Sequence, residues 1–327
     1  MSSLALKGPY WVTVRQYRRT LWLAAAAVAV SLTVVGGLRI WDAQTPDRLM
    51  ADGQRFPADE NRGYETLRLA MEYGGVYLLL LPLLVGAFVA GPLVAREFES
   101  GTYRLSLTQS VSPVAWLRAK LVSATGAGLL TLLALVAVYH VGWNRVSGSY
   151  GLSWADRGPY EATGVVHVAY LLAAIAVGAL LGLLVRRTLV AMAATGVVMG
   201  LVMLVMGTFR WSFLGVETAT GPAGPTLWTP ADALVMDSGL LTASGARFDR
   251  SVCWDEAART PGVDATEGLW GKVEAQCQAR HGVTGQFADF HPASHFWPTQ
   301  LIETGILLAL AALAAYAAFR VLRARLP

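Results

Sequence analysis

The chain has 327 residues, of which 54% are hydrophobic and only 15% are charged, whereas soluble domains carry about 25% charged residues. Together with a mean hydropathy of +0.46, this composition excludes an ordinary water-soluble globular protein and is typical of a membrane protein. The net charge of +4 is small, but it is unevenly distributed along the chain.

The N-terminal segment "GPYWVTVRQYRRTLW" precedes the first apolar stretch. Tyr10 and Tyr17 fall on one helical face, whereas Arg15 and Arg18 fall largely on another. This pattern predicts an amphipathic helix over residues 8–20 that lies in the membrane interface. A plain positively charged stop signal is the alternative. The apolar run that follows is long for a signal peptide, which favours a membrane anchor.

Six stretches are long and apolar enough to cross a bilayer, because a hydrocarbon core of about 30 Å needs about 20 helical residues. They are residues 20–39, 74–95, 119–141, 163–185, 188–207 and 301–319. No span carries a charge near its centre or paired carboxylates, and Glu303 falls in the first turn of the last span, where we expect water nearby. The predicted fold class is an all-α membrane protein with six transmembrane helices.

The segments between the spans differ in charge on alternate sides. The N-terminus, the second and fourth connections and the C-terminal tail hold 13 of the 26 Lys and Arg residues but only 2 of the 22 Asp and Glu residues. Loops that are rich in Lys and Arg face the cytosol in membrane proteins. Both termini and the connection between spans 2 and 3 are therefore predicted to be cytosolic.

The second span contains Pro82 and Pro92 with Gly86 and Gly91. Proline removes a backbone donor and bends a helix, and neighbouring helices can compensate for this in a membrane. A bent helix that lines a cavity and an ordinary packed helix both remain open.

Residues 208–300 form a long polar insert on the external side. Cys253 and Cys277 are the only cysteines in the chain, and the oxidising external side favours a disulfide between them. There are two alternatives. One is a zinc site that includes His281, and the other is a pair of free thiols. The predicted domains are therefore residues 1–207 (the interfacial helix and spans 1–5), an extracytoplasmic domain 208–300, and residues 301–327 (span 6 and the cytosolic tail).

The sequence contains no motif for nucleotide hydrolysis. There is no Walker A sequence, since Gly271-Lys272 is followed by Val273, and there is no zinc-protease or nucleophile-elbow motif. We therefore expect the chain not to be an enzyme and to hold no metal, catalytic or cofactor-binding residues.

The segment "AREFESGTYRLSLTQSVSPVAWLRAK", residues 95–120, is longer than a connection between two spans requires. It resembles the segment between the second and third spans of ABC-2 type transporter permeases at Glu97, Glu99, Gly101-Thr102, Val111-Ser112 and Lys120. It is also similar to the corresponding segment of the related ABCG exporters (type V exporters) at Glu97, Ser100, Gly101, Tyr103 and Arg104. In that family the segment forms a cytosolic coupling helix that docks on a nucleotide-binding subunit.

The residues themselves support part of this resemblance. Gly101 permits a turn that a side chain would oppose, and Ser112-Pro113 is typical of a helix start. Apolar and polar residues alternate after Gly101, so a helix over residues 102–110 follows from the resemblance alone, and a solvated loop is the alternative. The candidate residues for coupling are Glu97, Glu99, Gly101, Thr102, Tyr103, Arg104, Leu105 and Leu107.

The resemblance implies the permease subunit of a bacterial ABC exporter, multi-pass in the inner or plasma membrane. ATP and magnesium would bind a separate ATPase subunit, and no cofactor would bind this chain. The expected partners are that ATPase, a second permease chain, membrane lipid and a small amphiphilic or hydrophobic substrate, with no nucleic acid. The alternative is a non-transporting membrane protein with an external sensor domain and a cytosolic docking loop.

Overall fold

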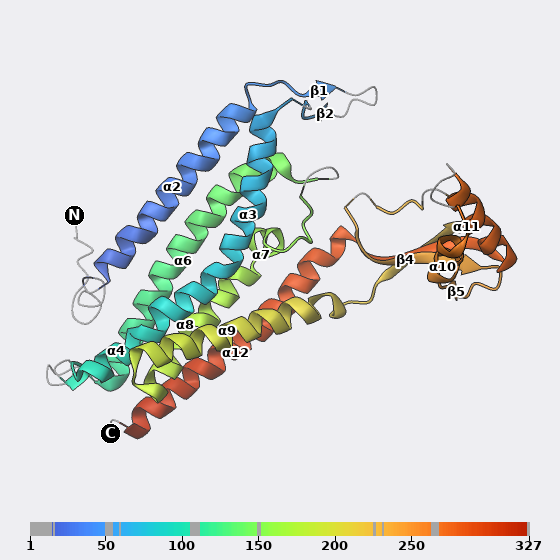
Figure 1. Cartoon of the computed structure of the whole chain (residues 1–327). Helices are drawn as coiled ribbons and strands as arrows, with labels where there is room; N and C mark the ends of the chain where they lie inside the picture. The colour runs from blue at the N-terminus through green and yellow to red at the C-terminus, as the bar shows by residue number, and fades with distance from the viewer. Residues whose placement is uncertain are drawn as a thin grey trace. The chain divides into compact units, whose positions relative to one another are not determined.

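The computed structural model describes residues 15, 17–49, 55–58, 60–104, 112–148, 152–224, 227–230, 232–262 and 268–325 (Figure 1). The chain divides into two compact units. The first comprises Met1–Phe213 with Trp297–Pro327, and the second comprises Leu214–Phe296. We describe each unit by itself.

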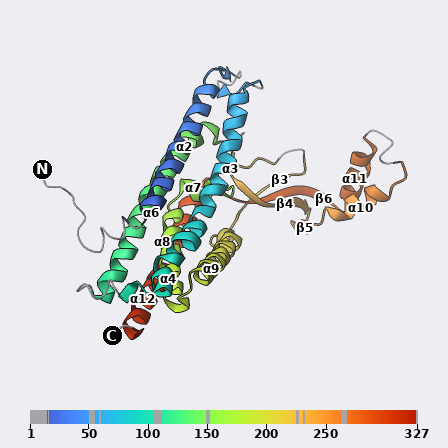
Figure 2. The ribbon, with the colours of Figure 1, turned by 60° about the vertical axis from the view of Figure 1, so that its left-hand side comes forward.

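The first unit is a bundle of helices (Figures 1 and 2). Its elements are α2 (Arg18–Asp42), α3 (Arg62–Val85), the π-helical segment η1 (Gly86–Ala90), α4 (Gly91–Ser100), α6 (Pro113–Val146), α7 (Pro159–Thr163), α8 (Val166–Val185), α9 (Thr188–Phe209), the 3-10 turn η2 (Arg210–Ser212) and α12 (Phe296–Arg325). A two-residue hairpin, β1 (Arg48–Leu49) with β2 (Arg55–Phe56), follows α2.

Six helical segments of the described chain are long and apolar enough to cross a membrane, as predicted. The second, third and sixth extend furthest beyond the predicted stretches: they run over Arg62–Ser100, Pro113–Val146 and Ala293–Arg325. The second begins early because the Asn61 side chain accepts a hydrogen bond from Tyr64 N (2.9 Å) and caps the helix. Helix ends depend on such caps, which a hydropathy window does not detect.

Successive helices run between two ends of the bundle (Figure 1). We call them the Gly101 end, where α2 and α9 begin and α4 and α12 end, and the Asp42 end, where α2 and α6 end. α8 lies at the centre of the bundle, because 67% of its most apolar stretch is buried, whereas only 6% of that of α2 is buried. Gly178 of α8 is closely covered, because a Cβ there would lie 2.6 Å from Ala90 Cβ and 2.8 Å from the Ala90 carbonyl carbon. Small residues thus let α8 approach η1 and α4.

The π-helical segment lies between the two prolines of the second span. Gly91 N donates to Gly86 O, a bond that skips one residue more than in an α-helix. Pro92 cannot donate to the preceding turn, so a local change in the hydrogen-bond pattern is expected next to it. Gly86, Ala87 and Ala90 are buried in this segment, which fits the packed-helix alternative there.

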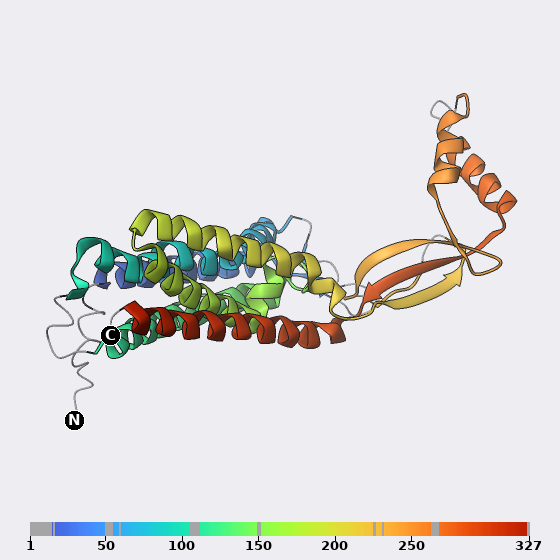
Figure 3. The same cartoon turned by 90° about the horizontal axis from the view of Figure 1, so that it is seen from below.

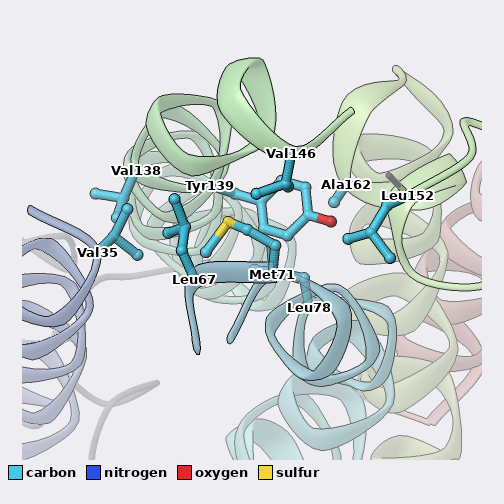
Figure 4. Packing of buried hydrophobic residues seen from close by; sticks show 9 residues of the cluster. All are labelled: Val35, Leu67, Met71, Leu78, Val138, Tyr139, Val146, Leu152 and Ala162. Atoms are coloured by element: carbon cyan, nitrogen blue, oxygen red, sulfur yellow. The ribbon is translucent and has the colours of Figure 1, made fainter. Parts of the chain in front are cut away.

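One apolar core cluster joins α2, α3 and α6 towards the Asp42 end (Figure 4). Its buried residues are Val35, Leu67, Met71, Leu78, Val138, Tyr139, Val146, Leu152 and Ala162. A second cluster at the Gly101 end joins α4, α6, α8 and α12 through Leu93, Trp116, Leu183 and Leu322, among others.

The second unit combines a sheet with two helices (Figure 3), so the expectation of an all-α fold is wrong for this unit, although the chain is mostly helical. The four antiparallel strands have the order β3 (Glu217–Pro222), β6 (Val283–His291), β4 (Leu234–Thr242) and β5 (Arg247–Phe248). Helices α10 (Ser251–Arg259) and α11 (Leu269–Arg280) pack together, and the turn η3 (Ala293–His295) follows β6. A disulfide joins Cys253 of α10 to Cys277 of α11, with their Cα atoms 5.5 Å apart. Both sulfur atoms are therefore unavailable to zinc, and the zinc and free-thiol alternatives are wrong.

Two predicted elements fall mostly outside the residues that the structure describes. The interfacial helix over residues 8–20 lies largely outside the described residues, and α2 already includes residues 18–20. The coupling helix also lies outside them, since of residues 102–110 only 102–104 are described.

Candidate coupling site and two ion clusters

Glu97, predicted to contact an ATPase, is turned into the chain's own core. Its carboxylate is buried and accepts from Lys120 Nζ (2.6 Å) and from Trp116 Nε1 (3.0 Å). Lys120 and Trp116 stand four residues apart and thus share one face of α6. The Lys120 ammonium also lies 5.3 Å from the Trp116 ring centroid. These contacts join the last turns of α4 to the first turns of α6.

Glu99 reaches a different helix. Its exposed carboxylate accepts hydrogen bonds from the backbone N and the side-chain hydroxyl of Thr188, the first residue of α9. A carboxylate at this position satisfies an unpaired N–H group and complements the positive end of the helix dipole. Glu99 therefore joins the end of α4 to the start of α9.

Gly101 ends α4 in the left-handed conformation, with φ of +73°. A Cβ at Gly101 would meet nothing within 4 Å, so the requirement for glycine here comes from the backbone conformation and not from packing. Beyond this turn Thr102 and Arg104 are exposed. Tyr103 is half-buried, and its ring stacks on Phe98 with the ring centroids 4.6 Å apart.

The other end of this connection is also fastened to the bundle. Ser112 accepts from Ala115 N (3.2 Å) and caps α6, which begins at Pro113, so the predicted helix start is confirmed. Leu105 and Leu107 lie outside the described residues. Of the eight predicted coupling residues, Glu97 and Glu99 thus hold the bundle together, whereas Thr102 and Arg104 remain accessible.

A buried ion cluster between α7, η2 and α12 was not foreseen from the sequence. Arg210 of η2 donates from Nη2 to Glu161 Oε1 (2.5 Å) and from Nε to Glu303 Oε2 (2.9 Å). Tyr170 OH donates to Glu303 Oε1 (2.5 Å), and the Arg210 guanidinium lies 3.8 Å from the Tyr160 ring centroid. One cation and two carboxylates from α7, η2 and α12 thus meet inside the protein.

One sequence expectation is wrong at this cluster. Glu303 is fully buried, although its place in the first turn of a span suggested nearby water. The second carboxylate, Glu161, comes from a short connection outside the predicted spans and pairs with the same arginine. The sequence signal that could have found the cluster is a set of single charges, each at the boundary of a different span.

A second ion cluster fixes α2. Arg145 near the end of α6 donates to Asp42 (Nε–Oδ2, 2.8 Å) and to Asp47 (Nη2–Oδ1, 2.5 Å). Asn61 Nδ2 also donates to Asp42 Oδ1 (3.1 Å). A Cβ on Gly63 would lie 2.6 Å from Asp42 N, so α3 begins in close contact with the end of α2. The first span is therefore firmly attached at the Asp42 end.

Among the described residues, no three His, Cys, Asp or Glu side chains come together in a way that could hold a metal ion. The arrangement at the Gly101 end consists of helix-to-helix contacts around an accessible connection. Such contacts can transmit movement, because a displacement of the connection acts on α6 through Glu97 and on α9 through Glu99.

Comparison with known proteins supports a transport role for this architecture. The family model described as "ABC-2 membrane transporter related" matches residues 20–210, which cover α2 to α9 and include both fastened ends of the connection. No curated protein and no solved structure matches the chain. The chain, a multi-pass membrane protein with six membrane-capable helices, therefore belongs to the ABC-2 membrane transporter related family.

Proposed function

We propose that the chain is the permease subunit of an ATP-binding-cassette transporter that exports an amphiphilic or hydrophobic compound. A separate nucleotide-binding subunit binds ATP and magnesium and hydrolyses the ATP. A second permease chain, identical or paired, completes the transmembrane pathway. Family membership supports the role as a permease, and the charge asymmetry supports placing the Gly101 end in the cytosol.

The observation that carries the proposal is the attachment of the connection that follows Gly101. The helix before it is joined to α6 by Glu97 and to α9 by Glu99, and the residue after it, Ser112, caps α6. An ATPase that binds this connection would act directly on spans 3 and 5. The buried pair of Glu97 and Lys120 resists separation, because a single buried charge left behind would be strongly unfavourable.

The proposed substrate class follows from the character of the helices. The chain offers apolar surfaces with isolated hydroxyl groups, such as Ser31 and Thr131, and no charged side chain near the middle of a span. Such a surface suits a compound that is largely apolar with a few polar groups. A strongly charged, fully hydrated substrate would have to give up its hydration without compensation.

The test is co-purification with an ABC ATPase encoded beside the gene. In Leu105→Asp and Leu107→Asp, a new charge would lie in the proposed contact with the ATPase, at a cost of several kcal/mol if it is buried there. We expect both variants to insert normally and to lose the ATPase and its stimulated turnover. Val216→Asp is the matched control, because it adds the same charge to an exposed apolar residue of the second unit.

ATPase binding and turnover at the wild-type level in both leucine variants would refute coupling through this connection. A partner that proves to be a kinase or another regulator would favour the sensor alternative over transport.

A further inference from the structure

Two adjoining apolar cavities follow α2 along the bundle. The larger, about 400 Å³, lies between α2, α3 and α6 towards the Asp42 end. The second, about 260 Å³, lies between the same helices towards the Gly101 end. Ala27, Leu81 and Leu135 line both cavities, so the two form one passage, which we call the span 1 groove. Figure 4 shows Val35, Met71 and Tyr139, which line the groove towards the Asp42 end.

The groove has a clear origin in the sequence. The residues of α2 that line it include Thr20, Ala24, Ala27 and Ser31, which are small and stand three or four positions apart on one helical face. The ion cluster at Asp42 fixes the far end of α2, and Val35 and Asp42 are its only buried residues among those described. Small side chains on a helix held at one end leave space beside its neighbours.

The groove opens towards the outside of the bundle. Ala27 and Val30 both line it and are both exposed, Val30 by 62%. In a bilayer the surrounding medium is hydrocarbon, and an empty apolar space would forfeit the packing contacts of its lining. The lining offers isolated hydroxyl groups but no charged side chain, so an apolar chain is a better occupant than water.

The dimensions fit an extended hydrocarbon chain. The lining residues of α2 run from Thr20 to Val35, which corresponds to about 22 Å at the rise of an α-helix. This length exceeds one leaflet of the hydrocarbon core, about 15 Å. The groove is therefore longer than one leaflet is thick, so it can hold an extended acyl chain.

Charge at the Gly101 end defines the other part of the ligand. Arg18 and Arg19 stand in the first turn of α2, and both are exposed. Their neighbours Tyr17, Thr20 and Leu21 line the groove. Exposed arginines next to a membrane surface attract anionic headgroups. We propose that the span 1 groove binds an acyl chain of an anionic phospholipid from this leaflet, with its phosphate at Arg18 and Arg19.

The proposal does not depend on transport activity, so it can be tested on the purified full-length chain. The probe is phosphatidylglycerol with a photoreactive diazirine in its acyl chain, in nanodiscs of phosphatidylcholine. After illumination, mass spectrometry maps the labelled residues. We expect adducts to concentrate on the groove lining, such as Leu81 and Leu135, and not on outward residues such as Leu130 and Leu201, which are 74% and 56% exposed.

A matched pair of variants tests whether the space itself is required. Ala27→Trp fills the point that both cavities share, whereas Ala26→Trp places the same ring on an exposed residue that does not line the groove. We expect Ala27→Trp to reduce labelling of the lining about tenfold and Ala26→Trp to leave it unchanged. The double variant Arg18→Gln/Arg19→Gln should reduce labelling by phosphatidylglycerol but not by a phosphatidylcholine probe.

Several outcomes would overturn the proposal. Adducts spread evenly over all outward-facing helices would indicate ordinary surrounding lipid, as would an unchanged pattern in Ala27→Trp. A chain that lacks residues 1–14 provides the last comparison. Unchanged labelling supports a lipid occupant, whereas a strong increase would mean that the N-terminal segment of the chain itself fills the groove. The wild-type map decides the matter even if Ala27→Trp does not fold.

Discussion

Replacing Arg210 by Met should destabilise the bundle strongly. Arg210 pairs with both Glu161 and Glu303, and all three side chains are no more than 4% exposed. The variant leaves two buried carboxylates without the counter-charge with which both pair. Methionine has a similar length, so the loss concerns charge and hydrogen bonds more than volume.

The expected magnitude follows from this burial. Removing one partner of a buried ion pair costs about 3–5 kcal/mol, because the remaining charge is left unpaired. For a unit of this size, 1 kcal/mol corresponds to about 2–4 °C in the unfolding midpoint. Arg210→Met should therefore lower the midpoint by about 6–20 °C. The control is Arg68→Met, which removes an ion pair with Glu65, whose side chain is 57% exposed, and should cost at most about 1 kcal/mol.

The assay is thermal unfolding of the full-length chain in one detergent, followed by size-exclusion chromatography. The triple variant Arg210→Met/Glu161→Gln/Glu303→Gln removes all three charges and should recover most of the lost stability, since a neutral cluster leaves no unpaired ion. If Arg210→Met unfolds at the same temperature as Arg68→Met, the cluster is not the buried arrangement described above.

Three further predictions concern other parts of the molecule. Gly178→Ala should destabilise the bundle by about 1–3 kcal/mol, because the added Cβ would meet the neighbouring backbone at 2.8 Å, whereas Gly126→Ala, with nothing within 4 Å, should not; thermal midpoints compare the two. Cys253→Ser should cost the second unit about 3–4 kcal/mol through the lost cross-link, which denaturant titration measures, and stability unchanged by reduction would contradict this. The hydroxyl of Thr218 and an arginine guanidinium lower the pKa of Asp289 below its ordinary value of 3.8. The stabilisation of the folded state by ionised Asp289 is therefore complete above pH 3.8 and is lost as the pH falls through the lower pKa of the folded protein. Asp289→Asn should therefore make the stability of the second unit depend less on pH in the acid range, which fluorescence can follow. An unchanged dependence on pH in that range would refute the assignment.

Much of the architecture follows from local sequence. Six spans are predicted correctly because the hydrophobic length of a segment is a property of the segment alone. The helix start at Ser112-Pro113 is local as well, because the cap contacts a backbone N–H three residues away. The disulfide follows from two cysteines and an expected oxidising side.

The partners of the charged residues could not be predicted in the same way. Glu97 and Glu99 stand in a segment that resembles a docking element, and both bind within this chain. Glu99 meets Thr188 across 89 residues of sequence, and Arg210 meets Glu303 across 93. No spacing rule connects residues so far apart, because only the packing of the helices brings them together.

By itself, the sequence determined the membrane class and the number of spans, since both depend on hydrophobicity summed over neighbouring residues. Only the tertiary structure decided that Glu161 and Glu303 share one arginine inside the protein, and that Glu97 joins α4 to α6. The physical reason is that an isolated charge is unfavourable away from water, so each charge takes the partner that the fold places next to it.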